Sequence, residues 1–262
     1  MNKQKIITFI NEKGGAGKTT TALNFAVGLA LKNFKVVILD ADPNKNLSLV
    51  SKLRTNKELI ISPALKETQI KEEDKQGIRS QLNKKNALDF FRSFTPHKEV
   101  NYYKNYDYII IDSPGRVLDV GGKNPEELAA SAVSCADLII IPLNASPLEV
   151  IGSNAVIKLI RAVNTAKAKR NKTPSQYLFS INREKTFTRL AKAVRKQIHN
   201  LYDIPDKGTA GKVKIFNTVI VERIIYQEAM LKGESVLEYQ KFGLANQEIN
   251  KLVKETLNIL KK

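Results

Sequence analysis

A strand, a glycine-rich loop and a helix follow one another near the start of the chain. The apolar run KIITFI (Lys5 to Ile10) is typical of a buried strand, and TTALNFAVGLALK has the composition and spacing of a helix. Between them, NEKGGAGKTTT (residues 11–21) resembles the Gly-x-x-x-x-Gly-Lys-Thr loop, although Glu12 stands where its first glycine is usual. This order predicts an α/β fold with a phosphate-binding loop.

The residue types of the loop suit a polyphosphate and a metal ion. Glycines in the range 14–17 let backbone N–H groups face phosphate oxygens without a Cβ clash, and the helix that follows adds the partial positive charge of its N-terminus. We expect Lys18 to pair with the β- and γ-phosphates and the Thr19 hydroxyl to bind Mg²⁺.

Further apolar runs alternate with helical stretches along the chain. Four of them read as strands: Lys35 to Asp40, Tyr106 to Asp112, Ala136 to Leu143 and Gln176 to Asn182. The clearest helical stretches are Pro125 to Cys135, Pro147 to Thr165, Thr188 to Tyr202 and Gly243 to Leu260. Continuous apolar strands that alternate with helices predict a mostly parallel sheet with helices on both faces.

Length and pattern favour a single domain over residues 1–262. The stretch 52–104 is polar and without clear period, so we interpret it as a surface excursion, in which ALDFF forms a short helix. No apolar run reaches the length of about 18 residues that a membrane span needs, and the N-terminus enters a strand without a secretory signal. We expect a cytoplasmic protein.

Three aspartates follow predicted strands. Asp112 closes YIIID, as the Walker-B carboxylate does when it holds Mg²⁺ through a water, and Asp40 and Asp42 close the strand that ends in ILDADP. Ligands of open α/β sheets lie beyond the carboxyl ends of the strands. A strand-end aspartate can also simply cap the next helix. Together with the loop, however, the three carboxylates predict one site.

These motifs together resemble the ParA family of deviant-Walker ATPases, within the wider group that includes MinD and the nitrogenase iron protein. The resemblance rests on KGGAGKTT (Lys13 to Thr20), DADPN (Asp40 to Asn44) and IIIDSPG (Ile109 to Gly115). It continues through ADLIIIPLNASPLEV and through the segment Phe216 to Glu238. The early position of the loop makes the chain similar to the short, ParF-like plasmid partition ATPases.

The resemblance implies an enzyme that hydrolyses ATP to ADP and phosphate with Mg²⁺, slowly alone and faster with a partner. Lys13 is then the signature lysine that reaches across a homodimer to the ATP of the facing subunit. The implied catalytic residues are Lys13, Lys18 and Asp42, with Asp42 orienting the attacking water. The implied Mg²⁺ residues are Thr19, Asp40 and Asp112. The implied nucleotide contacts are Lys13, Gly14, Gly15, Ala16, Gly17, Lys18, Thr19, Thr20 and Asn182.

Two amides qualify this assignment. Asn182 resembles the family position near adenine, but a strand-end turn residue would be equally at home there. Asn44 stands where the family usually has glutamine after DADP, and the shorter side chain changes what can be contacted at the interface. The sequence leaves both points open.

Basic residues are concentrated in the second part of the chain. The net charge is +17; residues 1–150 contain 21 basic and 17 acidic residues, whereas residues 151–262 contain 22 and 9. Such asymmetry favours a polyanionic partner over general solubility. In the predicted helix Thr188 to Tyr202, apolar positions fall on one side and basic ones on the other, as on a phosphate-binding face or a merely solvated one. The candidate DNA contacts are Arg189, Lys192, Arg195, Lys196 and, by family resemblance, Arg223.

The main functional hypothesis is a nucleoid-associated partition ATPase. Its ATP-bound dimer would bind nonspecific double-stranded DNA until a ParB-type centromere-binding protein stimulates hydrolysis. One alternative is a MinD-like switch at the membrane, with the closing helix as the inserting element, although we expect that helix to be core and a membrane partner to be absent. Another is a positioning ATPase for a protein cargo. A metal-cluster reductase is disfavoured because such enzymes need two cysteines per subunit and Cys135 stands alone.

Overall fold

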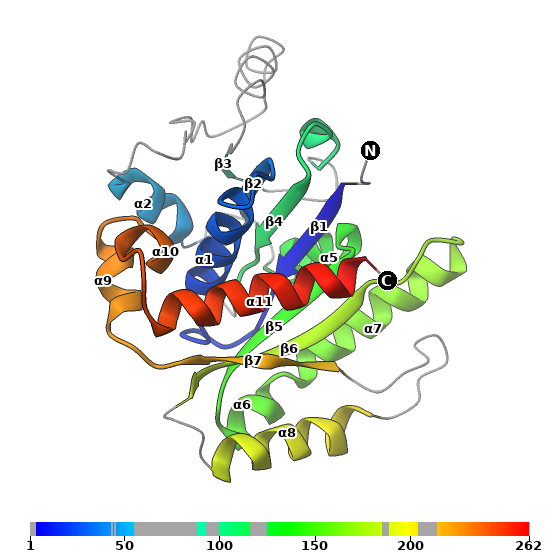
Figure 1. The fold of residues 1–262 in the computed structure, drawn as a ribbon. Helices are drawn as coiled ribbons and strands as arrows, with labels where there is room; N and C mark the ends of the chain where they lie inside the picture. The colour runs from blue at the N-terminus through cyan, green and yellow to red at the C-terminus, as the bar shows by residue number, and fades with distance from the viewer. Residues whose placement is uncertain are drawn as a thin grey trace.

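A seven-stranded sheet forms the centre of the protein (Figure 1). The computed structural model describes residues 4–42, 44, 46–54, 88–92, 100–115, 125–184, 189–203 and 214–261. The strand order is β3-β2-β4-β1-β5-β6-β7, and the pairings are parallel throughout. The strands are β1 Lys5–Phe9, β2 Val36–Asp40, β3 Leu88–Arg92, β4 Tyr108–Asp112, β5 Leu138–Asn144, β6 Gln176–Glu184 and β7 Lys214–Val221.

Helices cover both faces of this sheet, which confirms the predicted α/β architecture (Figure 1). Core residues of α1, α10 and α11 pack on one face, and those of α5, α7 and α8 pack on the other. The helices are α1 Lys18–Ala30, α2 Asn46–Leu53, α5 Pro125–Cys135, α6 Pro147–Gly152, α7 Asn154–Lys169, α8 Arg189–Tyr202, α9 Ile225–Leu231, α10 Val236–Tyr239 and α11 Leu244–Leu260, with a 3₁₀ turn at Val100–Tyr103.

The predicted elements agree with the structure except in two places. ALDFF was expected to be a short helix, and this was wrong: Leu88–Arg92 is the edge strand β3, paired in register with β2. A short apolar run does not by itself distinguish helix from strand, so the pairing edge decides. The stretch Pro147 to Thr165 is two helices with Ser153 between them. The strand β7 and the short helices α2, α9 and α10 were not predicted.

The prediction of a surface excursion at 52–104 falls mostly outside the described residues. Its described parts are the end of α2, the residue Arg54, the strand β3 and the segment that begins at Val100. That residues 1–262 form one domain stays a prediction.

The register of the sheet brings the predicted acidic strand ends together. Asp40 is the register partner of Asp112, which in turn pairs with Phe9 at the end of β1. The connection that follows β1 leads toward the β3 edge of the sheet, to β2. The connection that follows β4 leads toward the opposite edge, to β5. Ligands of such sheets bind at this kind of switch point, beyond the carboxyl ends of the strands.

Candidate phosphate-binding site

The glycine-rich loop leaves β1 and ends at the first turn of α1. Gly15 and Gly17 have positive φ angles of 79° and 85°, a region that L-residues with a side chain seldom adopt. A Cβ on Gly17 would lie 3.0 Å from Nδ2 of Asn182, whereas Gly14 and Gly15 face open space. The loop therefore keeps an open cradle of backbone next to the N-terminus of α1, as anion binding requires.

Lys18 is buried in the mouth of this cradle. Its Nζ donates to the Lys13 carbonyl oxygen at 3.3 Å, and Gly115 passes so close that a Cβ there would lie 3.1 Å from Nζ. Burial lowers the pKa of Lys18, while Asp112, Asp42 and Glu149 act in the opposite direction. A buried ammonium group held at a backbone cradle is suited to an anionic ligand.

Asp112 is a fully buried carboxyl group with too few polar partners. Burial and, next, the neighbouring Asp40 raise its pKa to about 8, although Thr19 and Lys18 lower it. Within the described residues, neither Asp112 oxygen has a hydrogen-bond partner of normal geometry. A cation at this carboxylate, bound directly or through water, would supply what is missing.

Asp40 and Asp42 lie beside Asp112 at the ends of neighbouring strands. The Asp42 amide donates to Asp40 Oδ1 at 3.1 Å, and the Asn44 amide donates to Asp42 Oδ1 at 2.9 Å. In the described part of the chain, no cluster of three or more acidic, histidine or cysteine side chains has the arrangement of a self-sufficient metal site. A Mg²⁺ ion here would complete its octahedral shell with water and phosphate oxygens, as is usual for this metal.

Asn182 joins the end of β6 to the loop. Its Nδ2 donates to the Ala16 carbonyl oxygen at 3.2 Å and to Thr21 Oγ1 at 2.9 Å, and its Oδ1 accepts from Ser180. The side chain is buried, so it holds the loop and α1 in a fixed relation to the sheet. That Asn182 also lies near an adenine stays a prediction.

Beside this asparagine, a cavity of about 490 Å³ extends away from the loop. Its walls are mostly apolar side chains of α2, α9, β7 and α11. Residues that line it include Gly17, Thr20, Thr21, Val50, Leu53, Asn182, Tyr226, Met230, Leu231 and Ile249. Ligand pockets of this kind are largely apolar with a few polar groups.

Lys13 lies outside the cradle and pairs with a residue that the sequence analysis missed. Its Nζ lies 2.7 Å from Oε1 of Glu149; the Lys13 side chain is 54% exposed and the Glu149 side chain 3%. Asn144 Nδ2 also donates to that oxygen, at 3.4 Å, and Oε2 has no partner among the described residues. Glu149 lies in the first turn of α6 and not at the end of β5, so the strand-end argument that found Asp42 does not select it.

The predicted basic face on α8 is only partly as expected. Val194 and Ile198 are buried, but Leu190 and Leu201, which were expected to pack with them, are exposed. The apolar side of the helix is completed by Tyr202 instead, which stacks on Phe179. The basic positions Arg189, Lys192 and Lys196 are exposed, whereas Arg195 is half-buried and reaches the Asn217 carbonyl oxygen at 3.4 Å.

Arg223, the other candidate DNA contact, lies apart from that face. Its guanidinium pairs with Glu248 of α11, with Nη2 2.8 Å from Oε1. Tyr226 donates to the other oxygen of the same carboxylate at 3.2 Å. A DNA contact by Arg223 would have to compete with this pair.

Comparisons with known proteins agree with this geometry. The model of a family described as "AAA domain" (AAA_31) matches residues 4–173. The chromosome partitioning protein ParA of Caulobacter vibrioides is 24% identical over 284 aligned positions, which cover 98% of this chain and 95% of that protein. MinD of Aquifex aeolicus superposes with a TM-score of 0.64 at 22% identity, over 97% of both chains.

A third relative carries a nucleotide analogue. A Borrelia burgdorferi B31 protein described as a plasmid partition protein, solved with AMPPNP bound, has a TM-score of 0.58 at 25% identity, over 99% of both chains. The family model alone spans more than half of the 262 residues. The protein therefore belongs to the AAA-domain family AAA_31, and its resemblance to the ParA family is confirmed.

Proposed function

We propose that this protein is a DNA-partition ATPase whose ATP-bound dimer binds nonspecific duplex DNA and is released when a partner stimulates hydrolysis. The observation that carries the proposal is that buried Lys18 and the buried Asp112 carboxyl group, which lacks a hydrogen-bond partner among the described residues, both lie beside an open backbone cradle. This arrangement provides one positive group for phosphate and one negative group for a metal ion. Relatives whose names refer to chromosome or plasmid partition support the partition role.

Each residue at the strand ends has a separate role in this proposal. Lys18 neutralises the β- and γ-phosphates, while Thr19 and Asp112 hold Mg²⁺, with Asp40 supporting from the next strand. Mg²⁺ supplies charge neutralisation of the phosphates when it is bound. Asp42 orients the attacking water. Because such sites work mainly by positioning and charge, a slow basal rate that a partner raises is physically reasonable.

Lys13 is proposed to act in the dimer and not in its own site. Lys18 already occupies the cradle, and Lys13 lies outside it on an exposed part of the loop. In the described chain its ammonium is held by Glu149. Reaching the nucleotide of a facing subunit requires this pair to open, so nucleotide-dependent dimerisation has a defined local step.

The basic half of the chain is the proposed DNA surface. Exposed Arg189, Lys192 and Lys196 on α8 offer contacts to DNA phosphates. Phosphate contacts carry no base sequence information, as suits nonspecific binding. The proposed stimulating partner is a ParB-type centromere-binding protein, and the proposed location is the nucleoid in the cytoplasm. A protein cargo carried on the nucleoid would use the same surface.

The structure gives less support to a MinD-like membrane switch. The apolar stripe of α11 that would insert into a bilayer is buried in the core: Ala245, Ile249, Leu252, Val253 and Thr256. Among the described residues, no helix is long and apolar enough to span a membrane. Membrane insertion by α11 would therefore require it to leave the sheet.

The test is ATP-dependent binding to an arbitrary duplex. Purified protein should retard or bind random-sequence DNA with ATP and Mg²⁺ at moderate salt, and binding should fall sharply without nucleotide. The matched control is Lys18→Ala, which should abolish ATP binding because the triphosphate loses its strongest charge-assisted contact. Wild-type protein that binds ATP but no DNA would refute the DNA part of the proposal. ATP-dependent sedimentation with anionic liposomes would favour the membrane alternative.

A further inference from the structure

The cavity beside Gly17 has one wall that is built from a short, peripheral helix. Val50 and Leu53 of α2 line it on one side, and Tyr226, Met230 and Leu231 belong to the α9 side. The helix α2 has only eight residues, too few to be stable by itself. Its position, and thus the shape of the cavity, must be fixed by contacts with the rest of the chain.

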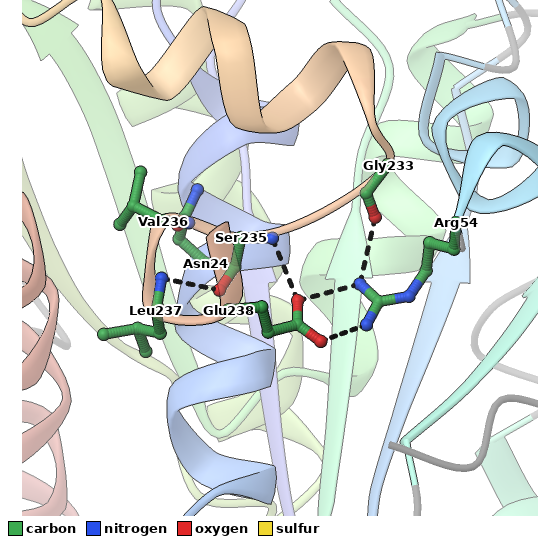
Figure 2. A network of polar contacts seen from close by, with 7 residues as sticks. All are labelled: Asn24, Arg54, Gly233, Ser235, Val236, Leu237 and Glu238. Atoms are coloured by element: carbon green, nitrogen blue, oxygen red, sulfur yellow. Dashed lines mark hydrogen bonds and ion pairs between the residues drawn. The ribbon is translucent and has the colours of Figure 1, made fainter. Parts of the chain in front are cut away.

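A buried ion pair fixes the C-terminal end of α2 (Figure 2). Arg54, the residue after the helix, pairs through both terminal nitrogens with the carboxylate of Glu238, and Nη1 also donates to the Gly233 carbonyl oxygen at 3.0 Å. The side chains are 2% and 4% exposed. A two-pronged arginine–carboxylate contact fixes direction as well as distance.

Glu238 is itself held in place by the start of α10. It accepts from the Ser235 amide at 2.9 Å, while the Ser235 hydroxyl accepts from the Leu237 amide at 3.1 Å, which completes a capping box. The next amide, Val236, donates to Asn24 Oδ1 at 2.8 Å. Asn24 belongs to α1, the helix that follows the phosphate loop. The network in Figure 2 thus connects the α2 wall to the phosphate-loop helix.

The backbone at Gly233 packs tightly against the C-terminal end of α2. Its φ is +68°, and a Cβ there would lie 2.4 Å from the Val50 carbonyl oxygen and 2.6 Å from the Arg54 amide nitrogen. Only glycine allows the turn after α9 to approach α2 so closely. The two helices on either side of the cavity are therefore in direct contact at its end.

We propose that Arg54 is a positioning residue that fixes α2 as the wall against the heterocyclic base of the bound nucleotide. The two-pronged contact fixes the direction of the Arg54 side chain as well as its distance from Glu238, and so fixes where α2 ends. The polyphosphate end of the ligand depends on the loop, whereas the base end depends on α2. The inference rests on the proposed nucleotide function and adds to it the residue that controls retention of the base.

The experiment compares a ligand with a base and one without. Calorimetric affinities for ATP and for inorganic tripolyphosphate, each with Mg²⁺, are measured on wild type, Arg54→Met and Arg54→Lys. Arg54→Met should weaken ATP binding about tenfold, the loss expected when one apolar wall no longer covers the ring. Tripolyphosphate affinity should stay within about twofold. Arg54→Lys keeps the charge but not the two-pronged contact, so its ATP affinity should lie between those of wild type and Arg54→Met.

Two further variants guard against a folding artefact. Gly233→Ala should reproduce the ATP-selective loss, because the added methyl displaces α2. Leu53→Ala removes part of the wall and leaves the ion pair intact. If Arg54→Met fails to fold, the ATP affinity of Leu53→Ala tests whether α2 contacts the base. The matched control is Arg161→Met, an arginine that joins α7 to the Tyr202 carbonyl oxygen of α8, which should leave both affinities unchanged.

Each outcome has a distinct meaning. Equal losses for ATP and tripolyphosphate in folded Arg54→Met would overturn the inference, and so would wild-type ATP affinity in that variant. If Arg54→Met is unfolded, wild-type ATP affinity in Leu53→Ala overturns it. Wild-type protein that binds neither ligand would instead refute the proposed nucleotide function.

Discussion

Lys13 and Glu149 of the same chain form an ion pair with a distance of 2.7 Å between Nζ and Oε1. The carboxylate is buried and the ammonium is half-exposed. If Lys13 leaves to contact a facing subunit, Glu149 is left as a buried charge with fewer partners, which costs free energy. The pair therefore opposes the dimer that the ParA resemblance implies.

Glu149→Gln should shift the equilibrium toward the dimer. The amide releases Lys13 without leaving a buried charge, so the ATP concentration at half-maximal dimerisation should fall about two- to fivefold, as expected for a half-exposed pair. Analytical ultracentrifugation across an ATP titration measures this. Equal midpoints for Glu149→Gln and wild type would show that the pair does not restrain Lys13.

Lys13→Ala should separate nucleotide binding from dimerisation. Lys18 and the backbone cradle remain, so monomer affinity for ADP should stay within about threefold of wild type. The ATP-dependent dimer should weaken, and DNA binding with it. On the same preparation, a fluorescence assay measures ADP binding and sedimentation with ATP measures dimerisation. Loss of ADP binding would place Lys13 in its own subunit's site.

Asp42→Ala should keep ATP binding but slow hydrolysis. The carboxylate that is proposed to orient the water is lost while Lys18, Thr19 and Asp112 remain, so turnover should fall by about tenfold or more and the DNA-bound state should accumulate. Phosphate release and DNA retention over time report the two effects. Normal turnover in this variant would remove Asp42 from its assigned role.

The basic face of α8 should control the salt dependence of DNA binding. The triple change Arg189→Ala, Lys192→Ala and Lys196→Ala should lower DNA affinity and reduce the log–log salt slope by about 0.9 for each lost phosphate contact. Dimerisation and basal hydrolysis should persist. A matched control removes three exposed lysines near α11: Lys241, Lys251 and Lys254. A slope that changes only in the control would move the DNA surface to α11.

Cys135 should be a poor nucleophile in the folded protein. Burial raises the pKa of its thiol from 9.0 to about 12, although Lys167 acts in the opposite direction. Because only the thiolate reacts, alkylation of the native chain should increase about 100-fold between pH 8 and 10. The alkylation rate of the urea-unfolded chain should level off near the ordinary pKa of a cysteine thiol. Mass spectrometry of iodoacetamide adducts measures both, and a native rate that levels off near pH 9 would contradict the shift.

The sequence by itself determined the parts of this protein that depend on local pattern. Strand β1, the loop 11–17 and helix α1 follow from apolar runs, glycine spacing and helix composition. Asp40, Asp42 and Asp112 could be assigned to one site because parallel strands end at a shared edge, and the register confirmed that Asp40 and Asp112 are neighbours. Family motifs added roles that local chemistry could not assign.

Only the tertiary structure decided the contacts between distant segments. The pair of Lys13 with Glu149 and that of Arg54 with Glu238 join residues 136 and 184 positions apart. Burial of the α11 stripe was decided in the same way, since an apolar helix face fits a core as well as a membrane. β3 also took its form from pairing with β2, because a segment as short as LDFFR has no strong preference until a neighbouring edge supplies hydrogen bonds.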